Sequence, residues 1–424
     1  MSRTTKAIII VLLTVLTALN AAAVKERERS RGEEITIVHA TDPHYLSPKL
    51  TDYGDHFMSI VKNADGKVTH LTPYLTDAFV RDMLLLMPDA VVISGDLTLN
   101  GAEESHRDFA KALEKLADAG IKVFVIPGNH DTDGTAYIFR DGKVYEKNAI
   151  ENGDFPAIYS KLGYADAVSR DEYSLSYFGA ISDSLWILMV DVNANDTFCT
   201  VRKETLQWID ENLKKARSEG IKVISSTHQP MSVHNDRFRF GYTVMNAESL
   251  MELYNKYDVR LNLAGHLHIQ HINHEDGFTD IAASSLAVFP NQYGVINIRN
   301  STIIDYETRS VDVSAWAEEN GMTLPSLLNF SEYSAGFFDA TTLSKLSKAF
   351  SGKALTEEEN VRLRAFAARI NREYFAGKSE VDGEDPDWIL WQEKMKGVSF
   401  GSYMEEIVRQ SPYDMTQFDF SVTK

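Results

Sequence analysis

The 424-residue sequence predicts an α/β protein with a mainly parallel sheet. Short apolar segments rich in β-branched residues alternate with longer segments whose apolar residues recur every three or four positions. Asp89, Gly120 and Gly220 stand in the breaks between them. Strands and helices that alternate in this way build a mainly parallel sheet with helices packed against it. From Leu324 onward only the helical pattern continues. The sequence therefore predicts an α/β domain followed by a smaller helical region.

Strands and helices are expected in alternation along the first two thirds of the chain. Apolar runs predict strands at residues 35–40, 90–94, 123–126, 185–190, 222–226 and 260–264, and further strands at 280–284, 294–298 and 302–307. Helical spacing predicts helices at 73–86, 103–119, 204–218 and 248–257, and in the last part of the chain at 341–350, 356–375 and 387–396. We therefore expect the α/β domain over residues 33–312 and the helical C-terminal region over residues 313–424.

The first 32 residues have a different character. Arg3 and Lys6 precede an apolar run at 7–24, which ends in small residues. This order is typical of a secretory signal peptide, and the run is also close to the about 20 apolar residues that an N-terminal membrane anchor needs. The charged residues that follow, at 25–31, are typical of a flexible tether. A cleaved signal and an uncleaved anchor both stay open, and either one predicts an extracytoplasmic protein, secreted or anchored.

The net charge and the cysteine content exclude some classes of function. The formal net charge of -18 disfavours a protein that binds nucleic acid non-specifically, because the phosphate backbone would be repelled. The one cysteine, Cys199, excludes an internal disulfide and any zinc site built from cysteines.

Polar side chains follow five of the expected strands, always at the carboxyl end. They are Asp42 and His44, then Asp96, then Asn129, His130 and Asp131, then His228, and finally His266 and His268. Open α/β sheets bind ligands at the carboxyl ends of their strands. Because residues two apart in an extended chain point to the same side, each pair of that spacing could hold one ion.

These five motifs, D-x-H, G-D, G-N-H-D, a lone His and G-H-x-H, occur in this order from Asp42 to His268. The ordered set resembles the calcineurin-like metallophosphoesterase superfamily. The resemblance implies a four-layer αββα sandwich and a dinuclear metal centre. The stretch V-I-S-G-D-L-T-L-N-G is similar to the branch that contains cyclic-nucleotide phosphodiesterases and exported phosphatases. The helical C-terminal region lies outside the resemblance.

The resemblance also implies a role for each ligand. The first metal would be held by Asp42, His44 and His268, the second by Asn129, His228 and His266, and Asp96 would bridge both. Imidazole and carboxylate ligands suit Mn, Fe or Zn without choosing among them. Leu99 stands three residues after Asp96, where purple acid phosphatases carry a tyrosine ligand, which argues against that coloured subclass.

Two cations about 3.5–4 Å apart can clamp the oxygens of a phosphate ester and lower the pKa of a shared water. The resulting hydroxide would attack phosphorus. His130 cannot easily be a ligand beside Asn129, because adjacent residues diverge, so we expect it to act as the general acid that protonates the leaving group. Asp131 would accept a hydrogen bond from the other ring nitrogen of His130 and orient it.

We therefore expect a metal-dependent phosphoesterase whose partner is a small-molecule phosphate ester rather than nucleic acid. A preference for monoesters or diesters and the oligomeric state are not predicted. A non-catalytic metal-binding module of the same fold is one alternative, although the complete ligand set and the intact His130–Asp131 pair argue against it. A nuclease is the other.

Several further polar residues carry expectations. His39 lies inside a strand and should be a core histidine. Three histidines that flank helices should be surface or capping residues: His56, His70 and His106. Arg237 and Arg239 follow His228 and are candidates for gripping a second phosphate or a diester, and the segment 132–182 should shape the pocket. The histidines His234, His271 and His274 are left open between pocket and structure.

Overall fold

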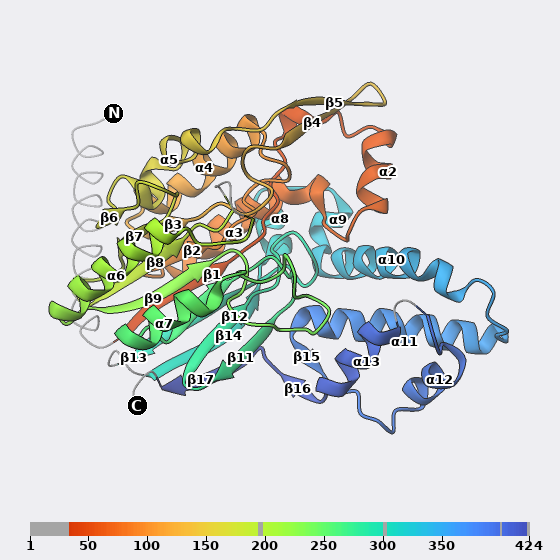
Figure 1. Ribbon diagram of the computed structural model, residues 1–424. Coiled ribbons are helices and arrows are strands. Elements are labelled where there is room, and N and C mark those ends of the chain that lie inside the picture. The colour runs from red at the N-terminus through yellow and green to blue at the C-terminus, as the bar shows by residue number, and fades with distance from the viewer. Residues whose placement is uncertain (1–33, 194–197, 300–302, 399–400, 422–424) are drawn as a thin grey trace, which may run out of the picture.

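Two packed β-sheets form the centre of the protein. The computed structural model describes residues 34–193, 198–299, 303–398 and 401–421 (Figure 1). The first sheet has the order β17-β14-β13-β1-β2-β3, and the second has the order β11-β12-β10-β9-β8-β7-β6. The strands of the first are β1 (Glu34–Ala40), β2 (Ala90–Ile93), β3 (Lys122–Val125), β13 (Gln292–Arg299), β14 (Ile303–Ser310) and β17 (Gln417–Ser421). Those of the second are β6 (Ser169–Arg170), β7 (Tyr177–Ala180), β8 (Leu185–Val190), β9 (Lys222–Thr227), β10 (Leu261–Ala264), β11 (His271–Glu275) and β12 (Phe278–Ala282).

The two sheets share one apolar core, and helices cover their outer faces. Buried residues of both sheets, such as Val91 and Leu263, belong to a single hydrophobic cluster that also holds Phe79 and Phe109 from the helices α3 (Thr72–Leu86) and α4 (Glu103–Asp118). The helices α6 (Lys203–Ser218) and α7 (Ala247–Tyr257) pack on the second sheet through a separate cluster. Helix, sheet, sheet and helix therefore form four layers, as the resemblance implied.

Helix α6 shows why these segments fold as they do. Its buried residues Thr205, Ile209, Leu213 and Ala216 recur every three or four positions and lie on one face. Glu204 in the first turn and the basic residues in the last turn stabilise the helix, because their charges interact favourably with its dipole. The helix ends just before Gly220, which has a φ of 73°.

A lobe of helices follows β14; its first helix packs on α3, and its later part lies beside the second sheet (Figure 1). It comprises α8 (Val313–Glu319), α9 (Pro325–Leu328), α10 (Phe330–Phe350), α11 (Glu357–Ala376), α12 (Pro386–Lys394) and α13 (Gly401–Gln410). Its core contains Phe366, Trp388 and Trp391, and also Leu267 and Ile269 of the α/β domain. The lobe and the α/β domain therefore share a core, and the shared part includes the loop between two candidate metal ligands.

The expected strands and helices are confirmed, with corrections to their arrangement. The strands form two sheets, as the αββα resemblance implied, but both sheets are mixed instead of mainly parallel, because β13, β14, β17, β11, β7 and β6 run antiparallel to their neighbours. The C-terminal region is not entirely helical, since β17 pairs with β14 in the first sheet. Helix α10 begins at Phe330, well before the expected start at residue 341. The segment 132–182 contains a hairpin of β4 (Thr135–Arg140) and β5 (Lys143–Asn148) that its exposed side chains did not reveal.

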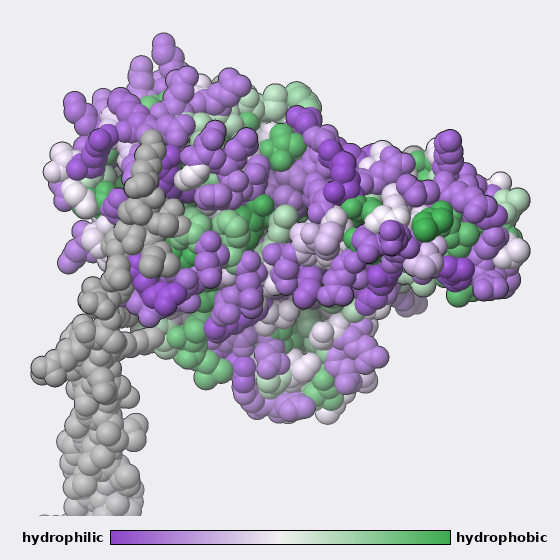
Figure 2. All heavy atoms as spheres, turned by 90° about the horizontal axis from the view of Figure 1, so that it is seen from below, coloured by the Kyte–Doolittle hydropathy of each residue, from purple (hydrophilic) through white to green (hydrophobic). Residues whose placement is uncertain are grey.

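The outer surface agrees with the charge of the sequence. Hydrophilic residues dominate the face shown in Figure 2, and apolar residues there form small separate patches. No helix among the described residues has the length and apolar character needed to cross a membrane. The apolar run at 7–24 lies outside the described residues, so the signal peptide or anchor stays a prediction.

Candidate metal centre

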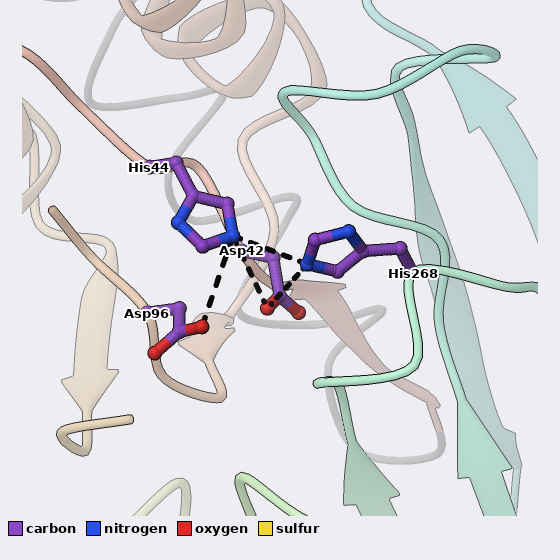
Figure 3. Close-up of side chains that lie close together, drawn as sticks. All are labelled: Asp42, His44, Asp96 and His268. Carbon is purple, nitrogen blue, oxygen red and sulfur yellow. Dashed lines mark hydrogen bonds and ion pairs between the residues drawn. The ribbon is translucent and has the colours of Figure 1, made fainter. Parts of the chain in front are cut away.

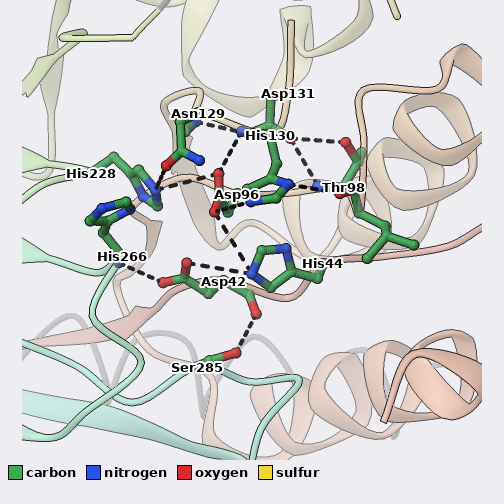
Figure 4. Close-up of polar contacts among 12 residues, drawn as sticks. Asp42, His44, Asp96, Thr98, Asn129, His130, Asp131, His228, His266 and Ser285 are labelled. Atoms are coloured by element: carbon green, nitrogen blue, oxygen red, sulfur yellow. Dashed lines mark hydrogen bonds and ion pairs between the residues drawn. The ribbon is translucent and has the colours of Figure 1, made fainter. Parts of the chain in front are cut away.

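The loops that follow β1, β2, β3, β9 and β10 meet at one edge of the sandwich (Figure 4). Backbone hydrogen bonds join them directly. The N–H of Asp42 donates to the carbonyl of Gly95 at 3.1 Å, and the N–H of His44 donates to that of Asp96 at 3.0 Å. The N–H of Gly265 donates to the carbonyl of His228 at 2.9 Å. The N–H of His130 donates to Oδ1 of Asp96 at 2.9 Å, and the same oxygen lies 3.4 Å from Nε2 of His228, so all five motifs of the sequence meet at one place.

Asp42, His44, Asp96 and His268 form a first group of potential ligands (Figure 3). The Nε2 atoms of His44 and His268 lie 3.1 Å apart. Asp42 Oδ1 lies 3.2 Å from His268 Nε2 and 3.7 Å from His44 Nε2. Atoms bound at about 2.0–2.2 Å around one ion have separations of this size.

Asp96, His228 and His266 form a second group, and Asn129 lies beside it. The Oδ1 atom of Asn129 is 3.1 Å from Nε2 of His228. Oδ1 of Asp96 lies 3.4 Å from His228 Nε2, whereas Oδ2 of Asp96 lies 3.7 Å from His44 Nε2 in the first group. The two oxygens of one carboxylate therefore face two different groups of ligands.

The ring nitrogens are oriented for a cation. Nδ1 of His228 donates to the carbonyl of Ser94 at 2.8 Å, which directs Nε2 to the centre, where loss of its proton to a binding cation would expose a lone pair. Nε2 of His266 donates to the carbonyl of Gly241 at 3.1 Å, which leaves the other nitrogen as the acceptor. Neutral imidazoles and carboxylates of this kind fit a transition metal ion, and backbone carbonyls are the usual partners that fix such rings.

The backbone at the centre is strained. Five of the potential ligands have a positive φ: Asp42 at 50°, His44 at 41°, Asp96 at 49°, His266 at 66° and His268 at 59°. Residues with a side chain rarely adopt this region, and strain of this kind is concentrated at functional sites. The loops are therefore shaped for the position of these side chains and not for local backbone stability.

Two glycines of the motifs are required by close packing. A Cβ atom on Gly128 would lie 2.2 Å from Oδ1 of Asp96, and one on Gly265 would lie 2.4 Å from Oδ2 of Asp42 and 1.9 Å from Oγ1 of Thr41. Any side chain at either position would displace a carboxylate of the centre. This explains the glycines of the G-N-H-D and G-H-x-H motifs in physical terms.

The charges of the centre act strongly on one another. Burial lowers the pKa of His228, but the carboxylates of Asp96 and Asp42 outweigh burial and raise it to about 9. Burial and then the charge of Lys67 hold the pKa of His44 well below its usual value. Burial favours the neutral form of Asp96, yet His228 and His130 hold its pKa well below the ordinary value. The carboxylate of Asp96 is thus ionised and available to cations.

Lys67 is a charged residue near the centre that sequence reasoning missed. Its side chain is 7% exposed and forms an ion pair of 2.6 Å with Asp65. The next residue, Val68, donates its N–H to the carbonyl of Ala287 at 2.8 Å, and Ala287 donates in turn to the carbonyl of Asp42. No motif marks the loop that carries Lys67, so the sequence held no signal for it.

The structure corrects the expected role of Asp131. The Nδ1 atom of His130 is 3.0 Å from the carbonyl oxygen of Leu99 and not from Asp131. The carboxylate of Asp131 is fully buried and accepts from the N–H groups of Leu97, Thr98 and Gly128 and from the hydroxyl of Thr98. Burial, and then the charge of Asp96, raise the pKa of Asp131 to about 7. Asp131 therefore fixes the loops on either side and does not touch the imidazole of His130.

Other expectations have mixed outcomes. His39 is confirmed as a core histidine, bonded to Ser94, and His56 is exposed as expected. The prediction that His70 and His106 are surface or capping residues is wrong: both are buried, and tyrosine hydroxyls lie 2.7 and 2.8 Å from their rings. Of the two arginine candidates, Arg237 donates to Ser402 and Arg239 pairs with Asp236. His234 and His271 are buried in a network with Asp280, and His274 contacts Thr279.

Comparison with known proteins agrees with this geometry. Residues 35–270, more than half of the chain, match the family model described as calcineurin-like phosphoesterase. Residues 312–414 match the model described as the C-terminal domain of cyclic nucleotide phosphodiesterase. The chain is 25% identical to a probable glycerophosphodiester phosphodiesterase of Arcobacter nitrofigilis over 243 residues, which cover 56% of this chain and 76% of the relative.

Two further proteins extend the comparison. A probable cyclic nucleotide phosphodiesterase of Ruthia magnifica is 22% identical over 268 residues, covering 63% of this chain and 98% of that protein. A dimetal phosphatase from Danio rerio of solved structure aligns at 13% identity with a TM-score of 0.46, covering 65% of this chain and 96% of that one. Because the family model spans more than half of the sequence, the chain belongs to the calcineurin-like phosphoesterase family and is a metal-dependent phosphoesterase.

Proposed function

We propose that this protein is a dinuclear-metal hydrolase that cleaves small phosphodiesters, with His130 as its general acid. The observation that carries the proposal is the carboxylate of Asp96, whose two oxygens face two separate groups of ligands. A carboxylate in this position can hold two cations side by side.

The side chains divide between two ions. Asp42, His44 and His268 would hold the first, and Asn129, His228 and His266 would hold the second, with Asp96 shared by both. Bound ions would supply positive charge to the phosphate oxygens and lower the pKa of a water held between them. Mn, Fe and Zn all suit these ligands.

His130 is placed to handle the proton of the leaving group. Its side chain is 41% exposed, and its Nε2 atom lies 4.0 Å from Oδ2 of Asp96, at the mouth of the centre. Donation from Nδ1 to the carbonyl of Leu99 fixes the ring, so that Nε2 points toward the position of a bound ester. A proton on Nε2 can then pass to the leaving oxygen as the P–O bond breaks.

The choice of diesters over monoesters rests on two relatives, each of which is described as a probable phosphodiesterase. A small substrate fits the net charge of -18 better than a nucleic-acid polymer does. A secreted or membrane-anchored protein remains our proposal for location, from the basic residues and the apolar run at 7–24.

The test compares a diester with a monoester on the full chain. Metal is removed with a chelator, Mn²⁺ is added back in steps, and hydrolysis of bis(p-nitrophenyl) phosphate and p-nitrophenyl phosphate is followed. We expect activity to rise up to two equivalents of metal and to be faster on the diester. Faster cleavage of the monoester would indicate a phosphatase instead. No cleavage of either substrate with two ions bound would favour the non-catalytic metal-binding module, and salt-sensitive cleavage of DNA would favour the nuclease.

A further inference from the structure

A group of exposed aromatic side chains lies beside the second set of ligands. Phe240 is 75% exposed, Phe198 is 65% exposed and Tyr242 is 40% exposed. The rings of Phe198 and Phe240 are 5.9 Å apart with an interplanar angle of 33°. A cluster of exposed aromatic residues indicates a surface that binds a ligand or a partner, because the exposure of their rings to water is unfavourable.

This aromatic group is joined directly to the metal centre. The ring of Tyr242 lies 5.4 Å from the ring of His266. Gly241, between the two aromatic residues of the loop, provides the carbonyl that accepts from Nε2 of His266. A molecule held by a metal ion at His266 would therefore have these rings as its neighbours.

The loop that carries the group is held in place from both sides. The N–H of Met245 donates to the carbonyl of Cys199 at 2.8 Å, which links the loop to the segment of Phe198. The amide of Asn235 donates to the hydroxyl of Tyr374 in α11 at 2.7 Å. The base of the loop is thus anchored to the helical lobe while Phe240 remains exposed. Anchoring of this kind positions the rings before any ligand arrives.

The side chains of the loop favour a flat aromatic group as the ligand of these rings and disfavour a lipid surface. Its two arginines are engaged elsewhere: Arg237 donates to Ser402, and Arg239 pairs with Asp236. Asp236 also pairs with Arg409 of α13 at 3.0 Å. The one arginine held by a neutral serine, Arg237, gives little attraction to anionic headgroups, and the net charge of the chain is -18. The loop instead places aromatic rings close to the metal ligand His266.

We propose that Phe198, Phe240 and Tyr242 form a subsite for the flat aromatic part of the ester, of the nucleobase class. The subsite rests on the proposed function, because it places the base next to a phosphate held at the centre. Stacking tolerates any base, since every base has a π face, so the subsite would favour nucleotide esters as a class over aliphatic diesters of equal charge.

The test compares two phosphodiesters that each carry one negative charge and differ in the aromatic group, adenosine 3′,5′-cyclic monophosphate and glycerophosphoglycerol. We expect Phe240→Ala and Phe198→Ala to raise KM for the nucleotide about 5- to 20-fold, near the lower part of the range for stacking, with kcat unchanged. KM for the aliphatic diester should change by less than about twofold. Phe240→Trp should retain the nucleotide KM, whereas Phe240→Leu should not, because only the former keeps an aromatic ring.

A matched control and a binding experiment separate the possible failures. Leu85 is 69% exposed at the end of α3, on the opposite edge of the sheet, and Leu85→Ala should change neither KM. Calorimetric binding of a phosphorothioate analogue of the cyclic nucleotide to the metal-loaded protein provides a readout without turnover. If the wild type binds the analogue through Phe240 but hydrolyses no ester, the subsite stands and the proposed function fails.

Three outcomes would overturn the subsite. The first is an unchanged ratio of the two KM values in Phe240→Ala and Phe198→Ala. The second is an equal rise in both KM values, which would mean that the loop only supports the metal ligands. The third is binding to phosphatidylcholine vesicles that Phe240→Ala abolishes while the nucleotide KM stays constant, which would assign the rings to a lipid surface.

Discussion

Replacement of Asp131 by asparagine distinguishes a residue that fixes loops from one that orients the acid. Each carboxylate oxygen of Asp131 accepts two hydrogen bonds: Oδ1 from the N–H and hydroxyl of Thr98, and Oδ2 from the N–H groups of Leu97 and Gly128. An amide must turn its NH₂ group toward one of these pairs. The less damaging orientation faces Thr98, whose hydroxyl can rotate to accept while its backbone N–H loses its partner.

The magnitude follows from that one lost bond. A buried donor without an acceptor costs about 1–3 kcal/mol. Burial, and then the charge of Asp96, disfavour the ionised form of Asp131 and raise its pKa to about 7, so removing the charge recovers part of the loss. We therefore expect Asp131→Asn to lower the free energy of unfolding by about 1–2 kcal/mol.

Metal binding should weaken in the same variant. Thr98 lies two residues after Asp96, so the loop that carries this shared ligand loses the support of the Thr98 N–H. Loss of such supporting bonds typically lowers metal affinity about 10–100-fold. Urea unfolding and calorimetric titration with Mn²⁺ measure the two effects, and Asp133→Asn, at an exposed carboxylate nearby, is the control that should change neither.

One result would refute this reasoning. If Asp131→Asn kept the urea midpoint and the Mn²⁺ affinity of the wild type, yet lost turnover as far as His130→Ala does, Asp131 would act through His130. The side-chain positions described above would then not be those of the working enzyme.

Three further predictions concern other parts of the molecule. His130→Ala should retain both metal ions while turnover falls about 10²–10⁴-fold, as shown by metal analysis and diester hydrolysis; undiminished turnover would exclude it as the acid. Gly265→Ala should cost about 1–3 kcal/mol in urea unfolding and weaken Mn²⁺ binding, because its Cβ would meet Thr41 and Asp42, whereas Gly336→Ala, with open space around it, should do neither. Burial lowers the pKa of His106 to about 4, so the stability that its neutral ring provides is complete above pH 6.5 and is lost as the pH falls toward 4. Between pH 7 and pH 5 the wild type should lose about 2 kcal/mol more than His106→Gln in urea unfolding, and equal losses would contradict the burial of a neutral ring.

The sequence was sufficient to predict which side chains converge, because strand ends in an α/β sheet lie at one edge. Asp42 and His268 are 226 residues apart, with His228 between them, yet their places after apolar strands brought all three together in the prediction. What the sequence could not provide was the direction of each bond. His130 and Asp131 are neighbours, but two partners of Asp131, Leu97 and Thr98, lie 34 and 33 residues away in another loop.

Elements without an apolar pattern were also missed, for a related reason. The residues of β5 are mostly exposed, so no alternation marks the hairpin, and the first turns of α10 bury Ser334 as well as Phe330. Lys67 is a surface-type residue that tertiary packing buries, and nothing in its neighbours along the chain indicates that. Local sequence patterns therefore predicted most strands, helices and metal ligands. The residues that hold those ligands in place depend on long-range packing, which local patterns do not show.

The pairing of β17 with β14 has a consequence for biosynthesis. All the helices of the lobe lie between these two strands in the sequence, so the lobe is topologically an insertion into the first sheet. During translation β14 leaves the ribosome more than one hundred residues before its partner, with one edge unpaired. An open edge is a template for pairing with other chains. Messages truncated within the lobe would therefore yield products prone to aggregate, and those products would include every potential ligand of the metal centre.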